Sequence, residues 1–251
     1  MMGDFWHGLI LSLIQGLTEF LPVSSSAHLI LVGKLGEWQD QGLVIDIAAH
    51  LGSLLAVMIY FRRELLELIS GRQNTLLVQI TIATIPIALT GLLLADQVSL
   101  WGRSLTVIAL ASAFFGVLLW LSQRAAADVQ LTFKNTLIIG LAQCLALIPG
   151  ASRSGVTLTA GMALGLSKEQ AARFSFLLAI PTILMATAYG GLKWLQAPQT
   201  IQSKDILIVL SLSFIFSWLS ISIFMKFIKR IDFIWFMFYR LLLAAILLLI
   251  I

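Results

Sequence analysis

Ionisable and hydroxyl side chains gather in the middle of two otherwise apolar stretches of the sequence. In the first stretch, Gln15 and Glu19 lie four residues apart, and a Pro-Val-Ser-Ser-Ser run leads from them to His28. In the second stretch, a Pro-Gly pair precedes Ser152 and Arg153. An ionisable group inside an apolar membrane segment costs roughly 2.5–3.5 kcal/mol on insertion scales, so these residues are functional candidates.

Each of these side chains can take part in binding or cleaving a phosphate group. Gln15 and Glu19 can share one face of a helical turn and hold a divalent cation. Arg153 offers planar bidentate donors that match phosphate. Gly150 frees the backbone, and hydroxyl and N–H groups near a helix start can bind an anion. A serine or water could attack phosphorus while His28 or Glu19 moves protons.

Taken together, these residue types are suited to hydrolysis of a phosphate ester or anhydride. The predicted catalytic residues are Glu19, Ser25, Ser26, His28, Ser152 and Arg153. The residues predicted to bind substrate are Gln15, Ser24, Gly150, Arg153, Ser154 and Thr157. Glu19 and Gln15 are the predicted ligands of a divalent cation, Mg²⁺ or Ca²⁺, with substrate phosphates completing its shell. The attacking group stays open between Ser25, Ser26, His28, Ser152 and a metal-activated water.

Structural roles are the alternatives for the same residues. Glu19 and Arg153 could form an ion pair that only holds the two stretches together. The serines could satisfy the backbone of an interrupted helix, and His28 could be a hydrogen-bonded packing residue. For His7, near the N-terminal interface, and for His50, alone on an apolar span, the prediction is a structural role.

The composition indicates a membrane protein rather than a soluble one. Hydrophobic residues make up 59% of the 251 residues and charged residues 11%, against roughly 25% charged residues in an average soluble domain. Mean hydropathy is +0.99. Basic residues in short loops explain the net charge of +4, so no nucleic acid is predicted as a partner. Cys144 is the single cysteine, which excludes an intrachain disulfide.

The predicted fold is an all-α polytopic membrane protein with six transmembrane helices and two re-entrant helical hairpins. The six uninterrupted apolar stretches cover residues 43–61, 76–95, 103–122, 172–190, 206–225 and 234–251. Proline, serine and ionisable residues interrupt the stretches at 5–32 and 135–164, so we expect these to dip into the bilayer and return. The whole chain, residues 1–251, is expected to form a single integral membrane domain.

The distribution of lysine and arginine tests this arrangement. If both hairpins return to the side from which they came, ten basic residues share one face and four lie on the other. The loops of the ten-residue face are 62–75, 123–134, 165–173 and 226–233. The positive-inside rule places these loops in the cytoplasm and the 33–42 segment outside. Water would then reach the first hairpin from the outer side of the membrane.

The two interrupted stretches resemble each other, which predicts an internal repeat. Each runs from a glutamine through an apolar turn and a proline to a serine-rich segment, and Gln15 and Gln143 are 128 positions apart. Each half, about 1–127 and 128–251, would contain one hairpin and three spans. Because three is odd, the second half would enter the membrane inverted. The hairpins would then meet near the midplane, where the functional site is expected.

Both motifs also resemble those of a known family. Gln15-Gly-Leu-Thr-Glu19, followed by Phe-Leu-Pro-Val-Ser-Ser, looks like the (E/Q)xxxE motif of the bacitracin-resistance type undecaprenyl-diphosphate phosphatases. The run PGASRSGVT, from Pro149 to Thr157, looks like their PGxSRSxxT motif. His28 stands where that family has its essential histidine. Many members have glutamate where this chain has Gln15, which cannot act as a base.

The resemblance implies an enzyme of the bacterial cytoplasmic (inner) membrane. It would hydrolyse undecaprenyl diphosphate to undecaprenyl phosphate and inorganic phosphate, which recycles the lipid carrier of cell-wall synthesis. The family also implies a divalent cation, an active site facing the periplasm, and six spans with two re-entrant hairpins in inverted repeats. The expected partners are the isoprenoid diphosphate lipid and membrane lipids, and a homodimer is left open.

Two other functions fit parts of the pattern. Inverted repeats with broken helices are also a transporter design, so the alternative is a secondary transporter or lipid flippase with a midplane anion site. A transporter needs no nucleophile, and the serine run beside His28 favours an enzyme. An intramembrane Ser/His protease is a weaker alternative, because it would give Arg153 no clear role.

Overall fold

The computed structural model of the chain describes residues 2–36, 38, 43–101, 104–196 and 203–251. Within these ranges the chain forms helices and no strand, which confirms the predicted all-α class. The elements in chain order are α1 (Met2–Thr18), α2 (Ser25–Leu35), α3 (Leu43–Tyr60), α4 (Arg62–Ile69), α5 (Asn74–Trp101), α6 (Leu105–Ser122), η1 (Gln123–Ala125), α7 (Phe133–Gln143), η2 (Cys144–Leu147), α8 (Arg153–Ala163), α9 (Lys168–Gln196), α10 (Ser203–Phe227) and α11 (Ile234–Leu249).

Among the described residues, five helices are long and apolar enough to cross a bilayer: α3, α5, α6, α9 and α10. They match the first five predicted spans, although residue 103 and part of the 33–42 segment lie outside the described residues. The sixth span, predicted at 234–251, forms the helix α11 of 16 residues. At 1.5 Å per residue this helix is about 24 Å long, somewhat less than the ~30 Å hydrocarbon core. The chain is a multi-pass membrane protein.

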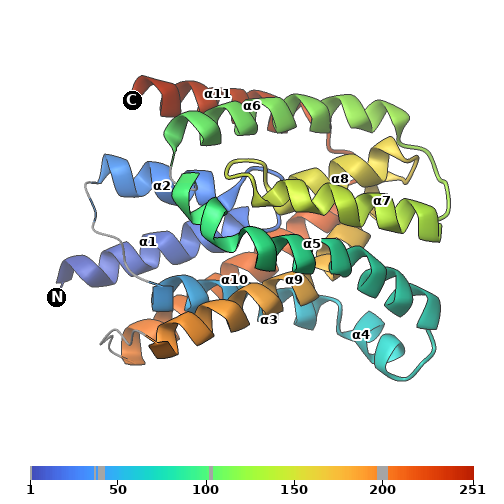
Figure 1. The fold of residues 1–251 in the computed structure, drawn as a ribbon, viewed down its shortest axis with the longest axis horizontal. Coiled ribbons are helices and arrows are strands. Elements are labelled where there is room, and N and C mark those ends of the chain that lie inside the picture. Colours follow the sequence, from blue (N-terminus) through green and yellow to red (C-terminus); the bar gives the residue numbers. More distant parts are fainter. Residues whose placement is uncertain (1, 37, 39–42, 102–103, 197–202) are drawn as a thin grey trace.

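The helices pack around the two interrupted stretches (Figure 1). α6 and α11 lie side by side along one edge of the molecule, and α3, α9 and α10 lie along the other. The pairs α1–α2 and α7–α8 lie between these two groups. The start of α1 and the end of α11 are at one end of the molecule, and α4 is at the opposite end.

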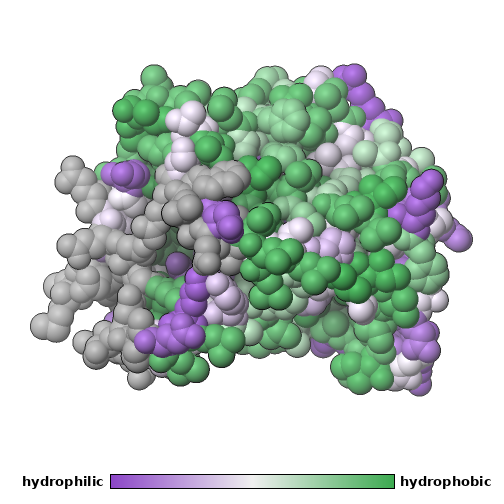
Figure 2. Space-filling view, in the orientation of Figure 1, coloured by the Kyte–Doolittle hydropathy of each residue, from purple (hydrophilic) through white to green (hydrophobic). Residues whose placement is uncertain are grey.

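The outer surface is apolar across its middle. Figure 2 shows hydrophobic residues covering most of the middle of the visible face, with hydrophilic residues lying mainly towards its two ends. Leu92 and Leu93 of α5 are 71% and 75% exposed, and Trp235 of α11 is 73% exposed. Large apolar side chains exposed to this extent suit a surface whose solvent is lipid.

Small residues let the helices approach one another closely. A side chain at Gly52 of α3 would collide with the backbone of α10, and a side chain at Gly140 of α7 would collide with the backbone of α5. Ser213 of α10 also donates a hydrogen bond across this contact, to the carbonyl oxygen of Ala49 at 2.7 Å. Close packing and interhelical hydrogen bonds are what hold helices together when lipid replaces water.

Each interrupted stretch forms two short helical segments with a break between them, as the sequence predicts. Residues 19–24 separate α1 from α2, and residues 148–152 separate η2 from α8. The last residue of each break is a serine with a left-handed backbone: φ is 70° at Ser24 and 71° at Ser152. We call these two units the first and second hairpins.

Arg240 of α11 joins the two breaks. Its side chain is completely buried and donates hydrogen bonds to the carbonyl oxygens of Gly150 and Ala151, at 2.8 and 2.9 Å, in the second hairpin. It also donates to the carbonyl oxygen of Pro22 in the first hairpin, at 3.3 Å, and to that of Ser112 in α6, at 3.0 Å. Irregular backbone within a membrane protein needs such partners. One buried guanidinium thus satisfies carbonyl groups of both hairpins.

Candidate active site

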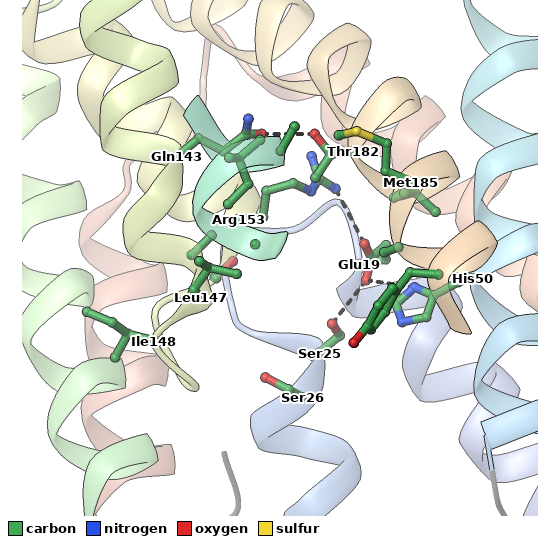
Figure 3. Close-up of a pocket in the computed structure, with 18 of the residues that line it drawn as sticks. Glu19, Ser25, Ser26, His50, Gln143, Leu147, Ile148, Arg153, Thr182 and Met185 are labelled. Atoms are coloured by element: carbon green, nitrogen blue, oxygen red, sulfur yellow. Dashed lines mark hydrogen bonds and ion pairs between the residues drawn. The ribbon is translucent and has the colours of Figure 1, made fainter. Parts of the chain in front are cut away.

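A cavity of about 550 Å³ lies where the two hairpins meet α3, α5 and α9 (Figure 3). Its polar lining includes six predicted site residues: Glu19, Ser24, Ser25, Ser26, Ser152 and Arg153. Polar residues that the sequence did not nominate also line it, among them His50, Gln143 and Thr182. The structure therefore brings groups from both halves of the chain into one cavity.

Glu19 and Arg153 form an ion pair between the two hairpins. The Oε1 atom of Glu19 lies 3.5 Å from an Nη atom of Arg153, and the two side chains are only 9% and 11% exposed. The other Nη atom of Arg153 donates to the carbonyl oxygen of Ser175 on α9, at 3.3 Å. A tight charge-assisted bond is about 2.7–2.9 Å long, so this pairing is loose. Arginine has five N–H donors, and these two contacts leave donors for an anion in the cavity.

Ser25 is the serine whose hydroxyl is paired with a carboxylate. Its Oγ donates to Oε2 of Glu19 at 3.0 Å. A carboxylate in this position can take the hydroxyl proton while the oxygen attacks phosphorus. By contrast, Ser26 is exposed and its Oγ lies 3.2 Å from that of Ser24.

Ser152 is the residue directly before α8, the second helix of the second hairpin. Its Oγ accepts the backbone N–H of Gly155 at 3.2 Å, so it caps α8. The same Oγ lies 3.2 Å from the Oγ of Ser154, which mirrors the contact between Ser24 and Ser26 in the first hairpin. Ser152 therefore combines a place in the cavity lining with a structural contact.

Five predicted site residues do not line the cavity. Gln15 is buried and contacts two residues that do, Glu19 and His50. The other four are His28, Gly150, Ser154 and Thr157. His28 is held between two partners: its Nδ1 lies 2.7 Å from the carbonyl oxygen of Ser24, and its Nε2 lies 2.6 Å from the hydroxyl of Tyr239 on α11. The buried Ser154 donates to the carbonyl oxygen of Leu21 at 2.9 Å, which ties one hairpin to the other.

The remaining two of these four residues are likewise held by contacts within the protein. Thr157 is buried, with its Oγ1 at 2.7 Å from the Oγ of Ser175, and Gly150 offers its carbonyl oxygen to Arg240. The contacts of these four residues position the hairpins, and direct contact between them and a substrate stays a prediction.

His50 of α3 is the imidazole that lines the cavity. Its Nδ1 lies 2.9 Å from Nε2 of Gln15, and the same nitrogen of Gln15 donates to Oε2 of Glu19 at 2.8 Å. The sequence predicted a structural role for His50 because it stands alone on an apolar span. Its partner is 35 positions away on α1, and the sequence carries no signal of that pairing.

Gln143 and Thr182 complete the polar lining on the side of the second hairpin. Gln143 is completely buried, and its Oε1 accepts a hydrogen bond from Thr182 at 3.3 Å. The repeat could have nominated Gln143, since it occupies the position that corresponds to Gln15.

Glu19 offers one hard oxygen ligand for a divalent cation. Within the described ranges, no group of three or more His, Cys, Asp or Glu side chains could hold a metal ion. Gln15 turns its Nε2 towards Glu19, and the buried Oε1 of Gln15 has no hydrogen-bond partner among the described residues. As a second metal ligand, Gln15 would have to turn its amide. A cation at Glu19 would need most of its ligands from elsewhere, and phosphate oxygens could supply them.

The rest of the cavity is an apolar arm. It is lined on α5 by Ile87, Ala88, Gly91 and Leu92, and on α9 by Met185, Ala186 and Tyr189. A side-chain carbon at Gly91 would meet nothing within 4 Å, so this wall is open. The cavity thus combines a charged end with an apolar arm that reaches a lipid-exposed helix, an arrangement that suits an amphiphile.

Comparisons with known proteins point the same way. Residues 8–246 match the family described as bacitracin resistance protein BacA. An undecaprenyl-diphosphatase of Saccharophagus degradans is 44% identical over 256 residues, which cover 96% of each chain. An undecaprenyl-diphosphatase of Hahella chejuensis is 45% identical over 251 residues, or 94% of each chain. Undecaprenyl-diphosphatase 1 of Pseudoalteromonas translucida is 44% identical over 252 residues, 94% of this chain and 95% of its own.

These relatives are named as hydrolases, and they give the transporter alternative no support. The similarity extends over nearly the whole chain, and the residues of both sequence motifs surround one cavity or hold its walls. The chain therefore belongs to the BacA bacitracin resistance protein family.

Proposed function

We propose that this chain hydrolyses undecaprenyl diphosphate to undecaprenyl phosphate and inorganic phosphate. The reaction would return the lipid carrier to cell-wall synthesis. One observation carries the proposal: Glu19 and Ser25 of the first hairpin meet Arg153 of the second hairpin in a single cavity. The names and the extent of similarity of the three relatives support it.

Arg153 would bind the diphosphate. Its guanidinium carries a permanent positive charge and matches two phosphate oxygens at once. α8 begins at Arg153, so the partial positive charge of a helix N-terminus adds to the attraction. The loose contact with Glu19 would lengthen as the guanidinium turns to the substrate.

Ser25 would attack the terminal phosphorus while Glu19 takes its proton. An Oγ–P bond forms, the bridging P–O bond breaks, and the lipid monophosphate leaves with the electron pair of that bond. Glu19 would pass that proton to the departing lipid phosphate and so become a carboxylate again. It would then accept a proton from water as the water oxygen attacks the phosphoserine. As the Oγ–P bond breaks and orthophosphate leaves, Glu19 would return this proton to Oγ, which restores the Ser25 hydroxyl. The 3.0 Å contact between the two side chains supports these roles.

Glu19 would be the protein ligand of a divalent cation, and the substrate phosphates would supply most of its other ligands. When bound, it would neutralise charge on the phosphate oxygens. The apolar arm between α5 and α9 would hold the first isoprene units of the tail, and the rest of the tail would stay in lipid beyond the exposed Leu92.

The enzyme would lie in the bacterial cytoplasmic membrane with its active site facing the periplasm. Ten basic residues lie in the four loops that were predicted to share one face, and α4 belongs to the first of these loops. The positive-inside rule therefore supports a cytoplasmic position for the end of the molecule that carries α4. The start of α1 and the end of α11 lie near the opposite end of the molecule, which would face the periplasm (Figure 1). The two hairpins would enter from opposite sides, as the second half of an inverted repeat requires.

Release of phosphate by purified protein in detergent tests the proposal, because transport would need two compartments and hydrolysis does not. We expect wild-type protein to release phosphate from undecaprenyl diphosphate. Ser25→Ala and Glu19→Gln should each lower kcat at least ~100-fold, the usual contribution of a nucleophile or general base. Ser222→Ala is the matched control, because its hydroxyl bonds the carbonyl oxygen of Trp218 on α10, away from the cavity. Wild-type rates in Ser25→Ala would contradict the assignment of the nucleophile.

A further inference from the structure

One imidazole in the cavity has no part in the reaction described above. His50 of α3 lines the cavity beside Glu19, whereas both ring nitrogens of His28 are engaged by Ser24 and Tyr239. The side chain of His50 is 38% exposed, and Figure 3 shows its ring next to Glu19. A bound phosphate group would therefore find His50 within the same polar end of the cavity.

Gln15 determines which nitrogen of the His50 ring carries the proton. Nε2 of Gln15 lies 2.8 Å from Oε2 of Glu19 and 2.9 Å from Nδ1 of His50. An ionised carboxylate only accepts hydrogen bonds, so Gln15 must direct its NH₂ group towards Glu19. The second N–H of the same group then points to Nδ1 of His50, which must be the accepting nitrogen. The neutral ring consequently carries its proton on Nε2.

The neighbouring charges agree with this tautomer. Oε2 of Glu19 lies 3.9 Å from Nδ1 of His50, too far for a hydrogen bond that would draw a proton to that nitrogen. The other oxygen of Glu19 is engaged by Arg153. Within the part of the chain that the structure describes, no protein group is hydrogen-bonded to Nε2 of His50, although the ring lines the cavity.

We propose that His50 is a further substrate-binding residue, which donates a hydrogen bond from Nε2 to a phosphate oxygen. Gln15 is then a positioning residue, because it acts on the substrate only by holding the tautomer of His50. The inference rests on the proposed function, since its ligand is the diphosphate group. Arg153 supplies positive charge from the second hairpin, and His50 adds a neutral donor from α3. Two donors on different helices fix the orientation of a diphosphate more firmly than one.

The tautomer can be read directly by nuclear magnetic resonance on protein labelled with ¹⁵N-histidine in detergent. The chain contains three histidines, so His7→Gln and His28→Gln variants suffice to assign the signals. We expect the His50 proton on Nε2 in the wild type and a loss of this preference in Gln15→Leu. Inorganic diphosphate should move the Nε2 signal of His50. A proton on Nδ1, or an Nε2 signal that no concentration of diphosphate moves, would overturn the proposal.

Two substitutions of His50 separate binding from a merely structural role. In His50→Gln, the longer amide places an N–H near the position of Nε2, so KM should stay within about threefold of the wild type. In His50→Asn, the amide reaches only as far as Nδ1. Its KM should rise at least ~10-fold, as expected for one lost hydrogen bond to a charged group. Equal KM values in the two variants would contradict the proposal.

His7→Gln is the control, because His7 stacks on Trp38 and does not line the cavity. If the proposed function were wrong, the wild type itself would release no phosphate from undecaprenyl diphosphate. The tautomer and the response of His50 to inorganic diphosphate would still give a result, so the two failures are distinguishable.

Discussion

Ser24 and Ser152, 128 positions apart, share a left-handed backbone conformation, with φ and ψ of 70° and 93° at Ser24 and 71° and 115° at Ser152. Within the described ranges they are the only residues other than glycine with positive φ. Each precedes the second helix of a hairpin, and each has its Oγ 3.2 Å from that of the serine two positions later. This shared geometry supports the proposed inverted repeat, and it makes both serines sensitive to changes in backbone preference.

Ser24 should therefore tolerate glycine better than a β-branched residue. The Ser24 side chain caps no helix in this structure, so Ser24→Gly should melt at or above the wild-type temperature. Ser24→Val should destabilise the fold by about 1–2 kcal/mol, because a β-branched side chain crowds a backbone with positive φ more than serine does. Thermal melting in detergent, followed by tryptophan fluorescence, checks both. Equal melting temperatures in the two variants would show that the positive φ at Ser24 does not strain the backbone.

Arg153→Lys should distinguish a substrate clamp from a structural ion pair. Lysine keeps the positive charge near Glu19 but loses the planar fork. Phosphate release should fall at least ~10-fold, since one charge-assisted hydrogen bond contributes about 1.5–3 kcal/mol. The melting temperature should change little. Near wild-type turnover by folded Arg153→Lys protein would exclude the clamp.

Binding of a divalent cation should depend on the substrate. Glu19 supplies a single carboxylate, so Mg²⁺ or Ca²⁺ should bind the substrate-free protein weakly, and chelation should abolish phosphate release. Isothermal titration with and without a non-hydrolysable diphosphate lipid analogue measures this coupling. Tight cation binding to substrate-free protein that Glu19→Ala leaves unchanged would place the metal elsewhere.

Arg240→Met should lower the free energy of unfolding by at least about 3 kcal/mol, because two or more hydrogen bonds from a charged donor are lost and carbonyl oxygens stay buried without partners. Arg240→Lys should be intermediate, since one ammonium cannot reach carbonyl groups on both hairpins and α6. Unfolding in mixed detergent and SDS micelles measures both. Arg63→Met, on the exposed face of α4, is the matched control. If Arg240→Met and this control were equally stable, the hydrogen bonds from Arg240 to the two hairpins would not stabilise the fold.

Cysteine labelling in intact cells checks the orientation. In a Cys144→Ser background, a membrane-impermeant thiol reagent should label a cysteine at Leu35, which is 64% exposed at the end of α2. It should spare a cysteine at Asn74, the exposed first residue of α5. The opposite pattern would invert the orientation, and labelling of both positions would mean that the number of spans is wrong.

The sequence could nominate Glu19 and Arg153 because each is an ionisable residue inside an interrupted apolar stretch. The structure places them 3.5 Å apart. The long apolar helices were predictable for a similar reason, since lipid demands continuous hydrophobic segments. The shorter α11 was not, because its apolar residues continue beyond Leu249, where the helix ends.

The roles of His50 and Arg240 could not be predicted from the sequence. His50 depends on which side of α3 faces α1, and the periodicity of a uniformly apolar helix does not give that direction. Arg240 is bound by carbonyl groups of loop residues, which have no characteristic side-chain pattern. In both cases the partner is defined only by the packing of distant helices.

The offset that relates Ser24 to Ser152 also pairs Ser25 with Arg153, and Glu19 with Leu147. The hydroxyl of Ser25 thus corresponds to the guanidinium of Arg153. The carboxylate of Glu19 corresponds to the apolar side chain of Leu147. If both hairpins had the sequence of the first, the site would hold two glutamates and no arginine. If both had the sequence of the second, it would hold two arginines and no carboxylate to act as a base. If the two halves are the inverted repeat proposed above, they could not be identical in sequence at these positions, because a strictly symmetric pair of hairpins would lack either the cation or the base of the proposed reaction.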